Sequence, residues 1–538
     1  MIRTLLLLLM IPIFSCRPTK PADTLLINAR IYTVNESFDQ ATAIAIKDGR
    51  ILGLGTDTEI LQDFQAEKTI DVEGKTLVPG WIDAHCHFLG LGLQQQKVDV
   101  SGTRSFEEVI QKIVAFQKEQ NTAYITGRGW DQNDWEVKDY PTKDRLDKLF
   151  PDTPVAIHRI DGHALLANQA AIEAAGVTVE TPFSGGEILQ KNGELTGIFI
   201  DQPMTMIEST IPAPSTEETI QALKAAEKIC FEHGLTTVSD AGLPRETIEL
   251  IDRLQQEGQL AIRIYAMVSA SDEHIDYYTN RGIIKTDRLN VRSFKIYADG
   301  ALGSRGAAMK EAYHDQQNHF GAMITPMSVL EGYAKKIAAS DYQLNTHAIG
   351  DAANHRVLRT YQQVLGQNPD RRWRIEHAQV VAPEDMALFK TALPSVQPTH
   401  ATSDMYWATD RVGNQRIKGA YAYKELLKQH GKIALGTDFP IEKVSPFLTF
   451  YAAVSRKDLQ QFPPEGFQME QALSREETLK GMTLWAAYAN FEEKEKGSIE
   501  VGKFADFIIL SKDIMEVDTS EIPTIKVVQT YLNGERVY

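Results

Sequence analysis

The fold of this chain is decided by the stretch Leu77-Val78-Pro79-Gly80-Trp81-Ile82-Asp83-Ala84-His85-Cys86-His87. Pro79-Gly80 bends the chain, and a short apolar run then ends in two histidines separated by one residue. Because residues i and i+2 of a strand point to the same face, His85 and His87 would present two imidazoles side by side. The pair is a natural start for a divalent metal site, and two hydrogen-bonded histidines in a half-buried strand are the alternative.

Length and composition place the chain among large globular proteins. Its 538 residues predict one large domain with a smaller one, and the hydrophobic share of 43% is ordinary for a soluble protein. The formal net charge of −16 argues against a nucleic-acid partner, because neutralising phosphates requires a basic surface.

The N-terminus has the pattern of an export signal. Arg3 precedes a short apolar run, and residues 1–16 end in a lipobox-like Ile13-Phe14-Ser15-Cys16. We expect lipidation of Cys16 and export to a bacterial periplasm or cell envelope, with membrane contact only through that anchor. Plain secretion with cleavage nearby, or a retained anchor, are the alternatives. The remaining cysteines, Cys86 and Cys230, are expected to be free.

Both ends of the mature chain are predicted to be β-rich. Lys47-Asp48-Gly49 and Asn533-Gly534 are hairpin turn signals between apolar runs, and Glu73-Gly74 is predicted to form a third hairpin. Neither end has a complete core by itself. We therefore expect 22–79 and 491–538 to pack together as one small β-sandwich domain.

The middle of the chain, 80–490, alternates short apolar strands with helical patterns. This alternation is typical of the α/β class, and about eight such units predict a (β/α)8 TIM-like barrel inserted into the terminal β-sandwich. The residues around 98–220 fit the count least well. We expect them to form an insertion.

Several of the predicted strands end in a side chain that can bind a metal. In a (β/α)8 barrel the reactive residues lie at the C-terminal ends of the strands. Each such residue alone is weak evidence, but their serial order after apolar runs is hard to explain as a background of ordinary polar groups. The candidates are His85, His87, Lys295, His347, His377 and Asp438.

The chain resembles the amidohydrolase superfamily, in particular amidohydrolase family 3, which includes N-substituted formamide deformylase. The resemblance covers nearly the whole mature chain. Its marks are Val78-Pro79-Gly80-Trp81-Ile82-Asp83-Ala84-His85-Cys86-His87, Lys295-Ile296-Tyr297-Ala298-Asp299-Gly300-Ala301-Leu302-Gly303-Ser304-Arg305, Thr346-His347-Ala348-Ile349-Gly350-Asp351, Ile375-Glu376-His377-Ala378, Gly436-Thr437-Asp438-Phe439-Pro440 and Gly497-Ser498-Ile499-Glu500-Val501-Gly502-Lys503-Phe504-Ala505-Asp506.

The resemblance implies one or two divalent metal ions per chain, with zinc as the first choice. The implied ligands are His85, His87 and Asp438 for one ion, His347 and His377 for a second, and Lys295 as a bridge. Lys295 would bridge as a carbamate formed with carbon dioxide, because a buried lysine beside cations loses its proton readily. The alternative is a plain ammonium at a single-metal site, paired with Asp299 or Asp438.

The expected reaction uses metal-activated water, with Asp438 taking its proton and returning it to the leaving nitrogen. Other strand-end residues would contact the substrate, and for each of them a structural or packing role is the alternative. These candidate substrate-binding residues are Trp130, Asp131, His163, Arg305, Gln397 and His400.

The function implied is a metal-dependent amidohydrolase that cleaves a non-peptide carbon–nitrogen bond, such as an amide, N-acyl or N-formyl bond, in a small molecule. The same fold could serve an isomerase, a dehydratase or an ester hydrolase. A third alternative is a surface lipoprotein that binds a ligand without catalysis. The complete set of metal ligands argues against it. Barrels of this superfamily often form homo-oligomers.

Overall fold

A computed structural model describes residues 19–160, 162–183, 185–366 and 369–538. The predicted signal segment and Cys16 lie outside these residues. The chain forms two compact units, one made of the chain up to Phe88 together with Glu227–Tyr538, the other of Leu89–Ala226. Each unit has its own sheets.

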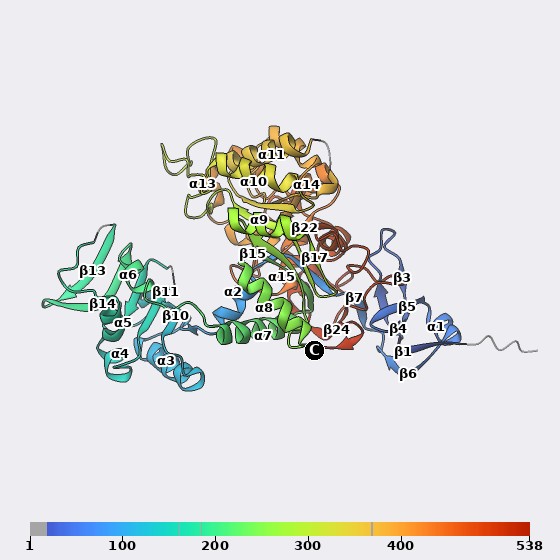
Figure 1. Ribbon diagram of the computed structural model, residues 1–538, viewed down its shortest axis with the longest axis horizontal. Coiled ribbons are helices and arrows are strands. Elements are labelled where there is room, and N and C mark those ends of the chain that lie inside the picture. The colour runs from blue at the N-terminus through green and yellow to red at the C-terminus, as the bar shows by residue number, and fades with distance from the viewer. Residues whose placement is uncertain (1–18, 161, 184, 367–368) are drawn as a thin grey trace, which may run out of the picture. The chain divides into compact units, whose positions relative to one another are not determined.

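The first unit contains a nearly closed barrel of parallel strands (Figure 1). In spatial order its eight strands are β8 (Trp81–Cys86), β15 (Leu235–Leu243), β16 (Arg263–Ser269), β18 (Leu289–Tyr297), β19 (Gln343–Ala348), β20 (Arg374–His377), β21 (Leu393–Val396) and β22 (Ala434–Leu435). The short β17 (Ile284–Lys285) pairs antiparallel with β18. The predicted (β/α)8 fold is confirmed.

Backbone hydrogen bonds join the segment that follows the last barrel strand to the end of the first strand. The Asp438 N–H donates to the His85 carbonyl at 2.8 Å, and the His87 N–H donates to the Phe439 carbonyl at 2.8 Å. The two ends of the ladder therefore meet at the point where the candidate ligands lie.

Helices follow most of the barrel strands, as the alternating sequence pattern predicts. On α8 the buried Ile248, Ile251 and Leu254 recur every three residues, which places them on one face. The helices are α7 (Thr216–Glu232), α8 (Arg245–Gln256), α9 (Asp272–Arg281), α10 (Met327–Ala338), α11 (Asp351–Leu365), α12 (Pro398–Asp404), α13 (Ala408–Arg416), α14 (Tyr423–His430), α15 (Pro446–Ser455), α16 (Arg475–Gly481) and α17 (Leu484–Ala489), with 3₁₀ turns at Pro369–Arg371, Pro383–Lys390, Ile417–Gly419 and Met469–Gln471.

The second unit is an α/β insertion with a six-stranded mixed sheet. Two buried hydrophobic clusters pack against this sheet, one with Trp130, Ile157 and Leu166 and the other with Leu165 and Phe199. In spatial order the strands are β13 (Gly186–Lys191), β14 (Glu194–Asp201), β12 (Ala164–Ala167), β11 (Val155–Arg159), β10 (Ile125–Trp130) and β9 (Val98–Asp99). The helices of this segment are α2 (Phe88–Gln94), α3 (Phe106–Gln120), α4 (Asp144–Leu149), α5 (Gln169–Ala174) and α6 (Met204–Glu208), with a 3₁₀ turn at Gln132–Asp134.

Both chain ends contribute to one of two further sheets. That sheet runs β25 (Glu535–Arg536), β24 (Val527–Leu532), β23 (Phe507–Leu510), β7 (Thr76–Pro79), β2 (Arg30–Tyr32) and β3 (Gln40–Ala41). The other runs β5 (Arg50–Gly55), β4 (Ala43–Lys47), β1 (Lys20–Ile27) and β6 (Phe64–Asp71), with α1 (Asp57–Asp63) after β5 and a 3₁₀ turn at Thr519–Thr524 before β24.

Of the three hairpins predicted from turn residues, two are present and one is not. The hairpins at Lys47-Asp48-Gly49 and Asn533-Gly534 are present. The predicted hairpin at Glu73-Gly74 is wrong, because the strand before it pairs with β1 and the strand after it pairs with β2 and β23. This turn therefore carries the chain from one sheet to the other.

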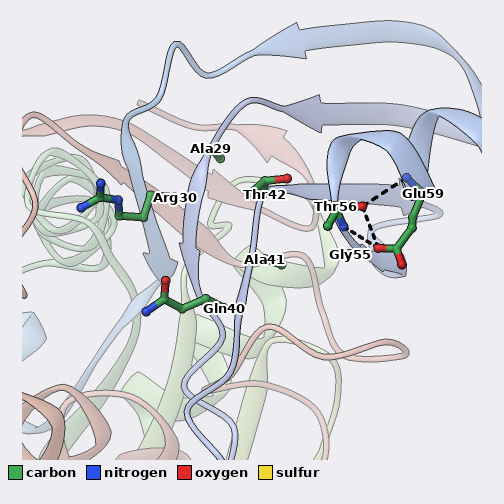
Figure 2. Close-up of a pocket in the computed structure, with 8 residues that line it drawn as sticks. All are labelled: Ala29, Arg30, Gln40, Ala41, Thr42, Gly55, Thr56 and Glu59. Atoms are coloured by element: carbon green, nitrogen blue, oxygen red, sulfur yellow. Dashed lines mark hydrogen bonds between the residues drawn. The ribbon is translucent and has the colours of Figure 1, made fainter.

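A hollow of about 380 Å³ opens in the terminal β region (Figure 2). Arg30 on its wall forms ion pairs with Asp513 and Glu516. Thr56 and Glu59, joined by hydrogen bonds in Figure 2, form the capping box at the start of α1. The charged groups of this hollow thus have structural roles.

Two smaller sequence expectations concern the cysteines and the membrane. Cys86 and Cys230 are buried and free, as predicted. In the described part of the chain, no helix combines the length and the apolar character that crossing a membrane would need.

A buried ion pair joins the barrel to the C-terminal part of the chain. Arg263 on β16 donates to both carboxylate oxygens of Asp506, at 2.6 and 3.0 Å, and both side chains are almost fully buried. The Asn533 N–H also donates to this carboxylate at 2.9 Å.

Removing the carboxylate would leave the Arg263 guanidinium buried without its partner. We expect Asp506→Ala to lower the free energy of unfolding by about 3–5 kcal/mol, measured by urea denaturation. Glu521→Ala, which removes the exposed partner of Lys512, is the matched control and should cost less than about 1 kcal/mol. Equal losses in the two variants would contradict this role for the buried pair.

Candidate metal centre and active site

The barrel brings all six predicted metal ligands to one place. The imidazole of His377 lies 4.8 Å from that of His85 and 4.6 Å from that of His347, measured between ring centroids. Lys295 Nζ lies 3.1 Å from His85 Nε2. Asp438, which follows the last strand, has Oδ1 at 3.3 Å from His87 Nε2 and 3.7 Å from His85 Nε2.

The donor atoms form two groups that share Asp438. In each group the donor atoms lie within 4.8 Å of one another: one comprises His85, His87 and Asp438, the other His377, His400 and Asp438. The first group is the predicted set. In the second, His400 has the position expected of a ligand, although sequence reasoning gave it a substrate-binding role, and its Nε2 lies 3.6 Å from Asp438 Oδ2.

His347 lies next to these groups. Its ring packs against His377, and its Nε2 is 3.7 Å from Asp299 Oδ1. Asp299 in turn accepts hydrogen bonds from the backbone N–H groups of Ala308, Ile349 and Gly350, so its carboxylate is held in place. This arrangement fixes the loop that follows β19.

The donor set fits a metal ion on two grounds. Buried polar atoms are nearly always hydrogen-bonded in proteins. Among the described residues, however, His347 Nε2, His400 Nε2 and Asp438 Oδ1 are buried and have no hydrogen-bond partner. In addition, imidazole and carboxylate are ligands that divalent first-row metals accept.

Carbonyl and carboxyl oxygens orient three of the imidazoles. An oxygen on Nδ1 leaves Nε2 free to bind a metal, as is usual for metal-binding histidines. The pairs are His85 Nδ1 with Glu376 Oε2 at 2.6 Å, His87 Nδ1 with the Ala241 carbonyl at 3.1 Å, and His377 Nδ1 with Gln397 Oε1 at 2.7 Å. Gln397, predicted to bind substrate, thus also orients His377.

The electrostatic environment favours the neutral imidazoles and the ionised carboxylate that metal binding needs. Burial, with His347 and His85 nearby, holds the pKa of His377 well below its usual value. Burial and the charge of Lys295 lower the pKa of His347 to about 3. Burial also lowers the pKa of Lys295 to about 8. For Asp438, burial raises the pKa, but the surrounding imidazoles outweigh it and hold the pKa below its usual value.

Two of the candidate ligands have a backbone conformation that side chains rarely adopt. His377 has φ of 74° and Asp438 has φ of 61°, both in the left-handed region. Strained residues of this kind cluster at functional sites, where the surrounding structure holds them.

Asp83 holds the first and last ligand-bearing segments together. It accepts hydrogen bonds from the His85 N–H at 3.1 Å and from the Thr437 hydroxyl at 2.7 Å. A Cβ at Gly436 would lie 2.6 Å from the His85 nitrogen, so only glycine fits there. Burial raises the pKa of Asp83 to about 7 despite these donors.

Three predicted substrate contacts lie in the inserted unit, where the structure gives each a local partner. Trp130 is buried and donates from Nε1 to the Ile157 carbonyl at 2.8 Å. Asp131 accepts from Arg159 at 2.5 Å. The exposed His163 pairs with Asp201 at 2.7 Å. Their contact with substrate stays a prediction.

Arg305, the remaining predicted substrate residue, follows β18 in the barrel unit. Its guanidinium donates to both oxygens of Asp315, at 3.0 and 2.8 Å, and Arg411 pairs with the same carboxylate. The structure therefore gives Arg305 a place in a loop-stabilising ion pair, and its contact with substrate also stays a prediction.

Sequence reasoning missed two residues of the site. Glu376, the partner of His85, is a fully buried carboxylate within an apolar strand. Tyr297 lies two residues after Lys295, its ring 4.9 Å from Lys295 Nζ and 5.5 Å from the ring of His347. The period of two along a strand could have found Tyr297.

Comparisons with known proteins show the family to which the chain belongs. Residues 68–538 match the model of the amidohydrolase family. YtcJ of Bacillus subtilis (strain 168) is 32% identical over 94% of this chain and 98% of its own length. N-substituted formamide deformylase of Arthrobacter pascens is 26% identical over 96% of this chain and 98% of its own. The crystal structure of an uncharacterized metal-dependent hydrolase from Pyrococcus horikoshii OT3 superposes with a TM-score of 0.78, at 27% identity, over 92% of this chain and 99% of its own.

Loss of the Glu376 charge should weaken metal binding without removing a ligand. We expect Glu376→Gln to lower metal affinity by about 10–100-fold, because the outer partner of a metal-binding histidine sets its orientation and basicity. Affinity is measured by competition with a chelator. His85→Ala should lower the metal content itself, and Glu384→Gln, an exposed carboxylate paired with Lys310, is the control. Unchanged metal stoichiometry in His85→Ala would rule out that ligand.

Proposed function

Because the chain belongs to the amidohydrolase family, we propose that it is a metal-dependent hydrolase that cleaves a non-peptide carbon–nitrogen bond in a small-molecule amide, N-acyl amine or N-formyl amine. The observation that carries the proposal is the cluster of buried, unpartnered donor atoms at the ends of the barrel strands. The relative named N-substituted formamide deformylase supports the N-formyl class.

The metal ligands in this proposal are the two groups that share Asp438, with His347 and Lys295 beside them. A divalent metal ion, zinc as the first choice, lowers the pKa of a bound water towards 7 and polarises a carbonyl. Lys295 would hold the metal site as a carbamate, formed when its neutral amine takes up carbon dioxide. In support, its Nζ is buried against His85, and a neutral amine is what carbon dioxide adds to.

Asp438 acts as the proton shuttle. Asp438 is 5% exposed, and its carboxylate lies beside His87 and His400. The surrounding imidazoles hold its pKa below the usual value, so the carboxylate is ionised. An ionised carboxylate can accept the proton of the attacking water. It can then return that proton to the nitrogen that leaves.

Tyr297 donates its hydroxyl to the oxygen of the scissile carbonyl. The residue is 40% exposed at the end of β18, so its phenol is accessible to a ligand. Its ring is held between Lys295 and His347. Within the residues the structure describes, the hydroxyl has no hydrogen-bond partner, so it is available to substrate. A donor that is already oriented stabilises the charge that develops on the carbonyl oxygen.

A substrate panel tests the function. The purified chain, metal-depleted and then reloaded with zinc, would be given N-formyl amines, N-acyl amines and the matching esters, with amine release as the readout. We expect metal-dependent release from at least one amide class. Hydrolysis of esters alone, or the same rate without metal, would contradict the proposal.

Asp438→Asn separates metal binding from proton transfer. The amide keeps an oxygen near the histidines but cannot take up the proton. We therefore expect nearly normal metal content and a loss of kcat of about a thousandfold. Elemental analysis and turnover are measured on the same sample. A variant with near-full turnover would remove Asp438 as the proton shuttle.

Tyr297→Phe tests the carbonyl donor. The substitution keeps the ring against His347 and removes only the hydroxyl, so metal content should not change. We expect kcat to fall by about a hundredfold with little change in KM, because the hydrogen bond strengthens in the transition state. Tyr313→Phe, which removes a buried hydroxyl bonded to the Ala307 carbonyl, is the matched control. A similar fall in both variants would assign Tyr297 a structural role.

A further inference from the structure

A second hollow, of about 290 Å³, lies between α12 and α15 in the barrel unit. These helices follow β21 and β22 in the chain. Two of its lining residues are close in sequence to the candidate metal centre. Thr399 directly precedes His400, and Glu442 lies shortly after Asp438. A volume of this size is at the lower limit of small-molecule sites.

The acceptor groups on the wall of this hollow are mostly engaged by the protein itself. Asp458 accepts from the Tyr406 hydroxyl and from the N–H groups of Gln460 and Phe462, the latter two at 2.8 Å. Glu442 accepts from the Ser403 hydroxyl at 2.6 Å. Asp458 thus accepts three hydrogen bonds from the protein and Glu442 accepts one.

Three hydrogen-bond donors on the wall of this hollow, in contrast, lack a partner among the described residues. Lys443 is exposed and Lys457 half-buried, and over the described ranges of the chain no ion pair or hydrogen bond joins either ammonium group to another protein group. Thr399, which is 8% exposed, has a buried hydroxyl that also lacks a partner. Two cations and a hydroxyl without partners call for a ligand that accepts hydrogen bonds and carries negative charge.

Part of the wall is apolar. Leu448 and Ala452 of α15 line one side, and Leu459 lines the loop. The ring of Tyr406 stacks on that of Phe462, with 5.7 Å between centroids, and both are largely exposed. An apolar body attached to the anionic group would cover this surface.

We propose that this hollow binds a small carboxylate with an apolar body, the carboxylate facing Lys443 and Lys457. A carboxylate matches because it only accepts hydrogen bonds and can take several donors. If the proposed amide hydrolysis holds, the carboxylate belongs either to the substrate, such as an N-formyl or N-acyl amino acid, or to a free acid bound beside the catalytic loops.

Direct binding tests the site without any turnover. Hexanoate and hexanamide would be titrated calorimetrically into the zinc-loaded full chain and into Lys443→Gln and Lys457→Gln. We expect hexanoate to bind at least tenfold more tightly than hexanamide, and each lysine substitution to weaken hexanoate about tenfold. Lys526→Gln, an exposed lysine of the terminal β region, is the charge-matched control and should change nothing.

A carboxylate can also bind to the metal ion itself. The lysine variants distinguish binding in this hollow from binding at the metal. Equal binding of hexanoate and hexanamide, or lysine variants that bind hexanoate like the unchanged chain, would overturn the proposal. If hexanoate binds through the lysines but no amide is hydrolysed, the proposed function fails and the site stands.

Turnover distinguishes the two sources of the carboxylate. N-formyl-leucine and N-formyl-leucinamide differ only in that group. If kcat/KM is higher for N-formyl-leucine and Lys457→Gln abolishes this preference, the hollow binds the carboxylate of the substrate. If kcat/KM shows no preference for the acid, but hexanoate binds through the lysines and alters turnover of N-formyl-leucinamide, the hollow binds a free carboxylate.

Discussion

The structure depends on the seam where the first barrel strand meets the segment after the last one. Two backbone hydrogen bonds close it, between Asp438 and His85 and between His87 and Phe439. Asp83 adds a buried carboxylate that receives donors from both sides. Because the histidine pair belongs to the first strand and the aspartate follows the last, the closure that completes the barrel also assembles the candidate metal centre.

The centre is built at a cost to stability that the surrounding structure offsets. An unpartnered buried donor or acceptor costs about 1–3 kcal/mol, and left-handed residues cost a similar amount each. Asp299 and Glu376 hold neighbouring loops and rings through hydrogen bonds made outside the centre. The unsatisfied atoms therefore remain at fixed positions, available to a metal ion.

The sequence predicted much of this site, because each ligand candidate ends an apolar run and a parallel barrel brings strand ends together. It did not predict the outer partner Glu376 or the place of His400, since both follow from how neighbouring strands and helices face each other. The wrong hairpin at Glu73-Gly74 has the same cause: local turn chemistry was correct, but β7 finds its partner β23 at the far end of the chain.

Elemental analysis of the purified chain shows directly whether a metal ion binds among these histidines. We expect one or two divalent ions per chain. Two ions, with a ¹³C-carbamate signal on Lys295 after exposure to labelled carbon dioxide, would correspond to the bridged site, and one ion without that signal to a single-metal site. A chain that binds no metal under any loading condition would contradict the account.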